Sequence, residues 1–151
     1  MKHFAHKRAR TRRYAMQALY QWDLSGEQIA EIEAQFLEAE DFSRADKPYF
    51  NELLKDISGN IEIIDKNLSE FIDRPLEQLD PVERAVLRIA ICELLLHPEI
   101  PYRVVISEAV MLAKKFGAEQ GHAFVNGVLD RAAHVIRPDE CTQKNRQVNG
   151  L

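Results

Sequence analysis

The sequence predicts an all-α protein, a single helical domain built from two small helical-bundle lobes. Apolar residues recur every three or four positions along most of the 151 residues, and no stretch alternates with the period of two typical of a half-buried strand. The composition, 46% hydrophobic and 29% charged with only 6 glycines, is that of a globular chain long enough to bury a core. We expect the domain to span residues 1–138, with lobes over about 8–73 and 80–138.

The first lobe is expected to hold three helices. The first covers residues 9–24, which contain no helix breaker, and ends before the Ser-Gly pair at 25–26. A short helix with an acidic outer side follows over residues 29–36. The apolar period from residue 50 to residue 71 predicts one long third helix, although Gly59 is a weak point inside it.

The second lobe is expected to begin with a buried central helix. Asp80 can act as its N-cap, Pro81 suits the first helical position, and Glu83 can reach back to complete a capping box. From residue 82 to residue 96, apolar side chains occupy nearly every side of the helix. That pattern is typical of a helix buried all round.

Two more helices and a tail complete the chain. The first is expected over residues 106–116, followed by a left-handed cap at Gly117. The second is expected over residues 124–136. The polar residues 139–151 are expected to form a disordered tail.

Positive charge gathers at the start of the first helix, although the net charge of the chain is −4. Cations at a helix N-terminus oppose the macrodipole, so a purely structural account predicts acids there. Because successive side chains are 100° apart, we expect this end to project or to stay loose until a ligand orders it. Arginines suit phosphates and unpaired RNA bases, and the alternative is a solubilising basic terminus. The cluster consists of Lys7, Arg8, Arg10, Arg12 and Arg13.

The first helix also carries a second apolar stripe. Met16, Tyr20 and Leu24 recur at intervals of four, opposite the stripe that faces the core. Either another part of the chain covers them, or they form a docking face with Tyr20 as an aromatic anchor. The residues alone leave both alternatives open.

Other chemistry is not indicated. Cys92 and Cys141 lie in settings too different for a disulfide and are expected to be free thiols. We expect no metal site, because His3 and His6 are the only close histidine pair and no ligand follows at the usual spacing. Glu93 lies within the buried helix, and we interpret it as a salt-bridged or capping residue rather than as a general acid.

The sequence also contains no phosphate-binding loop, dinucleotide motif or nucleophile elbow, so we expect neither an enzyme nor a cofactor. No apolar run reaches the roughly 18 residues of a membrane span, and the basic start lacks the apolar region of a signal peptide. The cytoplasm is therefore the expected compartment.

Three stretches of the chain resemble the NusB family of bacterial transcription antitermination factors. They are RARTRRYAMQALYQWD, LDPVERAVLRIAICELL and IPYRVVISEAVMLAKKFGAEQGHAFVNGVLDRAAHVIRP, and together they span Arg8 to Pro138. The resemblance implies an all-helical protein that binds the single-stranded boxA element of nascent ribosomal RNA together with NusE, a small-subunit ribosomal protein. It also implies that the pair joins RNA polymerase with other Nus factors and suppresses premature termination.

The resemblance further implies roles for particular residues. It assigns Tyr20, Leu24 and Glu83 to the surface that faces NusE, which favours the docking alternative for the stripe that starts at Met16. It places Gln120 on a surface near RNA and matches the basic cluster to an RNA-binding segment, which comprises Lys7, Arg8, Arg10, Arg12 and Arg13. The alternative is a self-associating helical module without specific RNA binding, in which Met16, Tyr20 and Leu24 form a dimer face.

Overall fold

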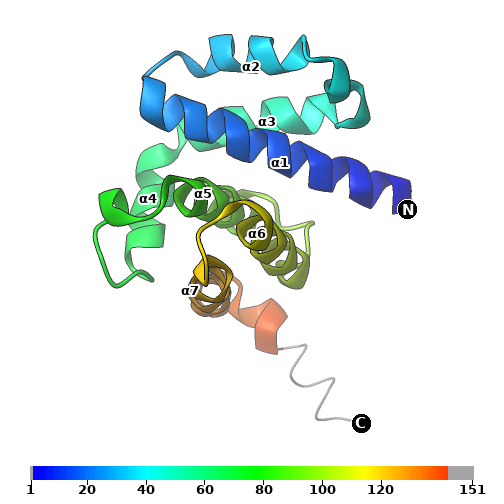
Figure 1. The fold of residues 1–151 in the computed structure, drawn as a ribbon. Helices are drawn as coiled ribbons and strands as arrows, with labels where there is room; N and C mark the ends of the chain where they lie inside the picture. Colours follow the sequence, from blue (N-terminus) through cyan, green and yellow to red (C-terminus); the bar gives the residue numbers. More distant parts are fainter. Residues whose placement is uncertain (1, 143–151) are drawn as a thin grey trace.

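The computed structural model describes residues 2–142, and within them every regular element is a helix, which confirms the all-α prediction. Seven α-helices lie wholly within the described residues, with two short 3-10 helices between them, and a further helical segment follows over residues 138–142 (Figure 1). They are α1 (Lys2–Ser25), α2 (Ile29–Leu37), η1 (Glu40–Arg44), α3 (Lys47–Gly59), α4 (Ile61–Ser69), η2 (Leu76–Gln78), α5 (Pro81–Leu96), α6 (Tyr102–Phe116) and α7 (Gly121–Ile136). No helix among these residues has the length and hydropathy needed to cross a membrane.

The α5 helix is the centre of the fold. It packs against α1, α3, α4, α6 and α7, and every residue from Glu83 to Leu94 is buried. The predicted N-cap is confirmed, since Asp80 Oδ1 accepts hydrogen bonds from the backbone N–H of Val82 at 2.9 Å and of Glu83 at 3.2 Å. A single apolar core runs through both halves of the described chain around this helix.

The α1 helix begins earlier than the sequence indicated. Its 24 residues include the whole arginine-rich stretch, with no acidic residue in the first turn. Thr11 is buried and its hydroxyl donates to the Lys7 carbonyl at 2.8 Å. The basic end is therefore helical rather than loose, and its first turns extend past α2 and α3 (Figure 1).

The prediction of one long third helix is wrong. The helix stops at Gly59, and α4 restarts at Ile61 after Asn60, whose φ of −126° and ψ of 24° are not helical. The Asp56 carbonyl accepts both the Asn60 backbone N–H at 3.1 Å and the Asn60 side-chain amide at 2.8 Å, so the side chain reinforces the end of α3. The break lets Ile64 reach the core as α4 packs on α5.

The expected disordered tail is also wrong for its first residues. The chain is helical again over residues 138–142, and Cys141 is buried there. Glu140 Oε1 accepts a hydrogen bond from the Tyr102 backbone N–H at 2.8 Å, which fixes this segment to the start of α6. Residues 143–151 lie outside the described part of the chain.

Arg137, which the sequence did not single out, closes the end of α5. Its guanidinium is buried and donates to the carbonyls of Glu93 at 2.9 Å, Leu94 at 3.1 Å and His97 at 2.9 Å, and also to that of Ile100. The last carbonyls of a helix have no partner inside the helix itself. Arg137 therefore supplies the donors that let α5 end inside the protein.

Candidate nucleic-acid interface

The predicted basic cluster divides according to the direction in which each side chain leaves α1. Arg12 points into the protein, where its Nε lies 2.9 and 3.1 Å from the two carboxylate oxygens of Glu93. Their side chains are 5% and 1% exposed. Glu93 is thus salt-bridged, as predicted. Arg12 leaves the set of candidate RNA contacts, because its charge is already paired inside the core.

Tyr49 completes this buried group by donating its hydroxyl proton to Glu93. Burial raises the pKa of Tyr49, and the adjacent Glu93 carboxylate raises it further. The hydroxyl therefore stays protonated and remains a donor. One buried carboxylate thus has two donors, one from α1 and one from α3.

Arg8 lies on the other side of Tyr49. Its guanidinium carbon is 3.8 Å from the Tyr49 ring centroid and 4.8 Å from that of Phe4, and its Nε is 3.9 Å from Asp46. The Nε atoms of Arg8 and Arg13 are buried without a hydrogen-bond partner among the described residues. Because these Nε atoms are inaccessible, a phosphate would have to bind the terminal nitrogens of either guanidinium.

Arg10 and Arg13 face a cleft between the start of α1 and the end of α6. The cleft has a volume of about 280 Å³, and Lys115 lines it from α6. We call it the basic cleft. Its walls are formed by His6, Ala9, Arg10, Arg13, Glu108, Met111, Leu112, Lys115 and Phe116.

The basic cleft combines positive charge with exposed apolar surface. Met111 is 59% exposed and Phe116 36% exposed, and the Lys115 ammonium lies 5.8 Å from the Phe116 ring. Cations that can hold phosphates beside a ring on which a base can stack form the usual surface for single-stranded nucleic acid. Glu108 is an acidic group in this lining and opposes anion binding locally.

Sequence reasoning missed the contribution of α6 to this cleft. Lys115 lies at the C-terminus of α6, where a cation is already favoured by the helix macrodipole, so it carried no separate signal. His6 and Phe116 were not singled out as RNA contacts. Only the packing of the chain brings the end of α6 beside Arg10 and Arg13.

Gln120 lies on the connection between α6 and α7. It is exposed and has a φ of 68°, and it is the only non-glycine residue with positive φ in the described chain. Gly117, where the left-handed cap was expected, instead has a φ of −85° and a ψ of 179°. A Cβ on Gly117 would lie 2.7 Å from the Ala113 carbonyl oxygen, so a close approach rather than a left-handed turn explains this glycine.

The second apolar stripe is only partly a surface. Tyr20 and Leu24 are 39% and 58% exposed, and both line a shallow groove with Phe36 of α2. Met16, by contrast, is 3% exposed and belongs to the core. The prediction that Met16 faces a partner is therefore wrong, because α1 is packed between α2, α3 and α5 over this part of its length.

Glu83 is also buried. It is 7% exposed, and a Cβ built on Gly121 would lie 1.6 Å from its Oε1 atom, so its carboxylate lies directly against the start of α7. Burial, with a smaller contribution from the Asp80 carboxylate, raises the pKa of Glu83. The side chain lies under the connection from α6 rather than on an open surface beside Tyr20, which corrects its assignment to a partner-facing surface.

One continuous stripe remains on the outer side of α1. Arg10, Arg13, Gln17, Tyr20 and Leu24 are spaced by three and four residues, which places them on one face of the helix. We call this the outer stripe. It is cationic at the end that lines the basic cleft and apolar at the end that lines the groove with α2.

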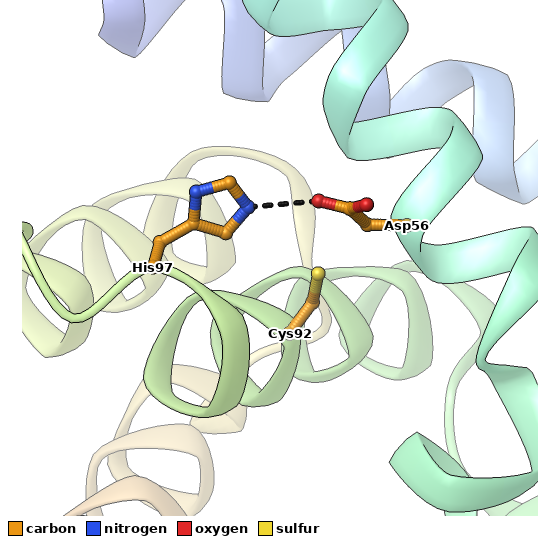
Figure 2. Close-up of side chains that lie close together, drawn as sticks. All are labelled: Asp56, Cys92 and His97. Carbon is orange, nitrogen blue, oxygen red and sulfur yellow. Dashed lines mark hydrogen bonds and ion pairs between the residues drawn. The ribbon is translucent and has the colours of Figure 1, made fainter.

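A separate group of side chains has the composition of a metal site, which the sequence did not indicate. Asp56, Cys92 and His97 each offer one ligand atom, and these atoms all lie within 4.8 Å of one another (Figure 2). Cys92 and His97 are five residues apart at the end of α5, and Asp56 comes from α3, so only the packing of the two helices brings the three side chains together.

Comparison with known proteins identifies the family. The model of the NusB family matches residues 9–134. The chain belongs to the NusB family. Transcription antitermination protein NusB of Idiomarina loihiensis is 48% identical over 131 residues, which cover 87% of this chain and 94% of that protein. The NusB of Escherichia coli is 50% identical over 133 residues, covering 88% and 96% of the two chains.

Solved NusB structures share the fold. The structure of T. maritima NusB superposes with a TM-score of 0.76 at 34% identity, covering 83% of this chain and 89% of that one. A crystal structure of the antitermination factors NusB and NusE in complex with dsRNA gives a TM-score of 0.72 at 28% identity, covering 89% and 98%.

Proposed function

We propose that this chain is a transcription antitermination factor that binds boxA RNA together with NusE and helps RNA polymerase, with other Nus factors, to read through terminators. The observation that carries the proposal is the basic cleft, where cations of α1 and α6 lie beside exposed Phe116. The family membership and the related NusB–NusE–dsRNA complex support it. Such work on nascent RNA would take place in the cytoplasm and requires no catalytic group.

The proposed RNA contacts are the cations in and near the basic cleft that are not paired with a carboxylate in the core. Arg10, Arg13 and Lys115 line the cleft, and Lys7 lies one turn before Arg10 on α1. Arg8 lies outside the cleft, beside Tyr49, and would contact RNA that extends past it. Gln120 adds an exposed amide on the connection that follows α6. We assign Arg12 a supporting role, since its pairing with Glu93 fixes the helix from which its neighbours project.

The proposed partner contacts are Tyr20 and Leu24. Both are exposed at the apolar end of the outer stripe. A half-exposed tyrosine beside an aliphatic side chain is the kind of residue that anchors protein interfaces. Met16 and Glu83 would affect this surface only through the packing below it.

Titration of labelled boxA RNA tests the RNA site. Arg10→Ala and Lys115→Ala should each weaken binding several-fold and flatten the plot of log K against log salt by about 0.7 per lost phosphate contact. The exposed Lys66 of α4 provides the matched control, and Lys66→Ala should leave both affinity and slope unchanged.

The RNA experiment needs three ligands: boxA, a scrambled strand of the same composition, and a duplex form of boxA. Preference for single-stranded boxA supports the proposal. Equal binding of all three, or unchanged affinity and slope in Arg10→Ala and Lys115→Ala, contradicts it.

Binding of purified NusE tests the partner face. Tyr20→Ala should weaken NusE binding at least ten-fold while the unfolding temperature stays nearly unchanged, since Tyr20 is 39% exposed. Exposed Leu37 of α2 offers a control for the loss of an apolar surface side chain. If NusE does not bind and the mass in solution is that of a dimer which Tyr20→Ala dissociates, the groove is a self-association face instead.

A further inference from the structure

We propose that Asp56, Cys92 and His97 form a zinc-binding site that joins α3 to the end of α5. The three ligand atoms lie within 4.8 Å of one another and come from two helices that already pack together. The site would bind a metal ion, whereas the proposed contacts on α1 and α6 bind RNA and NusE. The inference therefore depends on neither of those proposals.

His97 is already held in the orientation that a metal ligand needs. Its Nε2 lies 3.0 Å from Oδ2 of Asp56, and its Nδ1 lies 3.2 Å from Oε1 of Glu99. Histidines that bind zinc usually donate the other ring N–H to a carboxylate, which fixes the tautomer and leaves the ligating nitrogen unprotonated. Glu99 is such an outer carboxylate, and the edge of the imidazole is packed against Tyr49 at a centroid distance of 5.7 Å.

Cys92 supplies the sulfur. Its side chain is completely buried and points from α5 toward the space between His97 and Asp56 (Figure 2). Burial raises the pKa of the thiol, and the carboxylates of Asp56, Glu93 and Glu52 raise it further. The same negative potential attracts a divalent cation, and as the Zn–S bond forms the thiol proton passes to solvent.

The donor set selects zinc over the common hard cations. One thiolate, one imidazole and one carboxylate suit Zn²⁺, whereas Mg²⁺ and Ca²⁺ prefer oxygen ligands alone. Zinc bond lengths place tetrahedral ligands roughly 3.3–3.7 Å apart, so shifts of about 1 Å close the site. Glu52 and Glu99 both lie beside His97 Nδ1, on the side of the ring away from Nε2, so we expect water as the fourth ligand.

Cobalt substitution tests the site on the full chain. Addition of Co²⁺ should produce a sulfur-to-cobalt charge-transfer band in the near ultraviolet that saturates at one equivalent and disappears when Zn²⁺ is added. Cys92→Ser should lose the band, while Cys141→Ser, which removes the other buried thiol, should keep it. Cobalt bound only to the exposed His6 gives no sulfur band.

The unfolding temperature provides a second test that does not require the Cys92→Ser variant to fold. Zinc should raise the unfolding temperature of the unaltered protein and of Cys141→Ser, and should have less effect on Asp56→Asn, whose side chain is partly exposed and tolerates the change. The proposal is overturned if the folded, unaltered protein gives no charge-transfer band with excess Co²⁺. A band that persists in Cys92→Ser would equally overturn it, because the sulfur would then be that of Cys141.

Discussion

Arg10 and Arg12 are two positions apart on α1 but have different environments. They leave α1 about 200° apart, so one reaches the basic cleft and the other the core. The charge of Arg12 is neutralised by Glu93, whereas no carboxylate is recorded within ion-pair distance of Arg10 in the described chain. Composition alone cannot distinguish them, because the partner of Arg12 lies 81 residues away along the chain.

We predict that Arg12→Ala destabilises the protein by about 3–5 kcal/mol, because it leaves the Glu93 carboxylate buried and unpaired. Urea unfolding followed by circular dichroism measures the loss. Arg10→Ala should change stability by no more than about 0.5 kcal/mol.

The double variant Arg12→Met with Glu93→Gln provides the control. It keeps an acceptor for Tyr49 while removing both charges, so it should recover most of the stability that Arg12→Ala loses. A loss below about 1 kcal/mol for Arg12→Ala would contradict the assignment of a structural ion pair.

Gly121 supports a second prediction for a single residue. Gly121→Ala places a methyl group on the Glu83 carboxylate and should destabilise the protein by about 1–3 kcal/mol. The same change in a Glu83→Ala background should cost much less, since the obstructing atoms are gone. Equal losses in both backgrounds, measured in a double-mutant cycle, would show that Glu83 is not the cause.

At the scale of the elements, side chains cap both ends of α5. Asp80 caps the first turn, and Arg137 reaches from beyond α7 to the last carbonyls. The sequence predicted the first cap, because an N-cap is read from adjacent residues. It could not predict the second, because Arg137 is 44 residues from Glu93 in the chain.

We predict that Arg137→Ala destabilises the protein by about 3 kcal/mol, since it removes the side-chain donor of the buried Leu94 and Ile100 carbonyls. The carbonyls of Glu93 and His97 lose one of two donors, because each also accepts a backbone N–H. Exposed Arg103 of α6 offers a matched arginine, and Arg103→Ala should have an effect below about 0.5 kcal/mol. Chemical denaturation measures both, and equal effects would refute the capping role.

The break at Asn60 illustrates why the position of a helix end is hard to predict. The apolar period continues from α3 into α4, and a glycine inside a helix costs only about 1 kcal/mol, so the sequence also permits one long helix. Packing of Ile64 and Leu68 into the core decides between the two forms. The burial of α5, by contrast, could be predicted from the sequence alone, because its apolar residues occupy nearly every side of the helix.

At the scale of the whole molecule, ion pairs and the core both join the two halves. Asp23 at the end of α1 lies 2.6 Å from Arg84 and 3.4 Å from Arg88 of α5, and Arg88 also pairs with Asp65 of α4 at 2.9 Å. The apolar core is likewise one cluster. These contacts favour two lobes that fold as one unit.

We therefore predict a single cooperative unfolding transition. The chain holds one tryptophan, Trp22, so its fluorescence reports on the packing of α1 against the core, while far-ultraviolet circular dichroism reports on all helices. The two urea curves should coincide. Separate midpoints would mean that the lobes unfold independently.

Because the outer stripe lies on one helix, α1 fixes the spacing between the two proposed contacts. At 1.5 Å per residue, Arg10 and Leu24 stand about 21 Å apart along the axis, and they share one helical phase. One residue inserted after Gln17 would turn the apolar end by about 100° away from the cationic end, and it would also turn Ala18 and Leu19 out of the core. The packing of α1 therefore fixes the angle between the two ends of the stripe. With the proposed contacts, the distance and the angle between a bound RNA and a bound protein would be set by one helix.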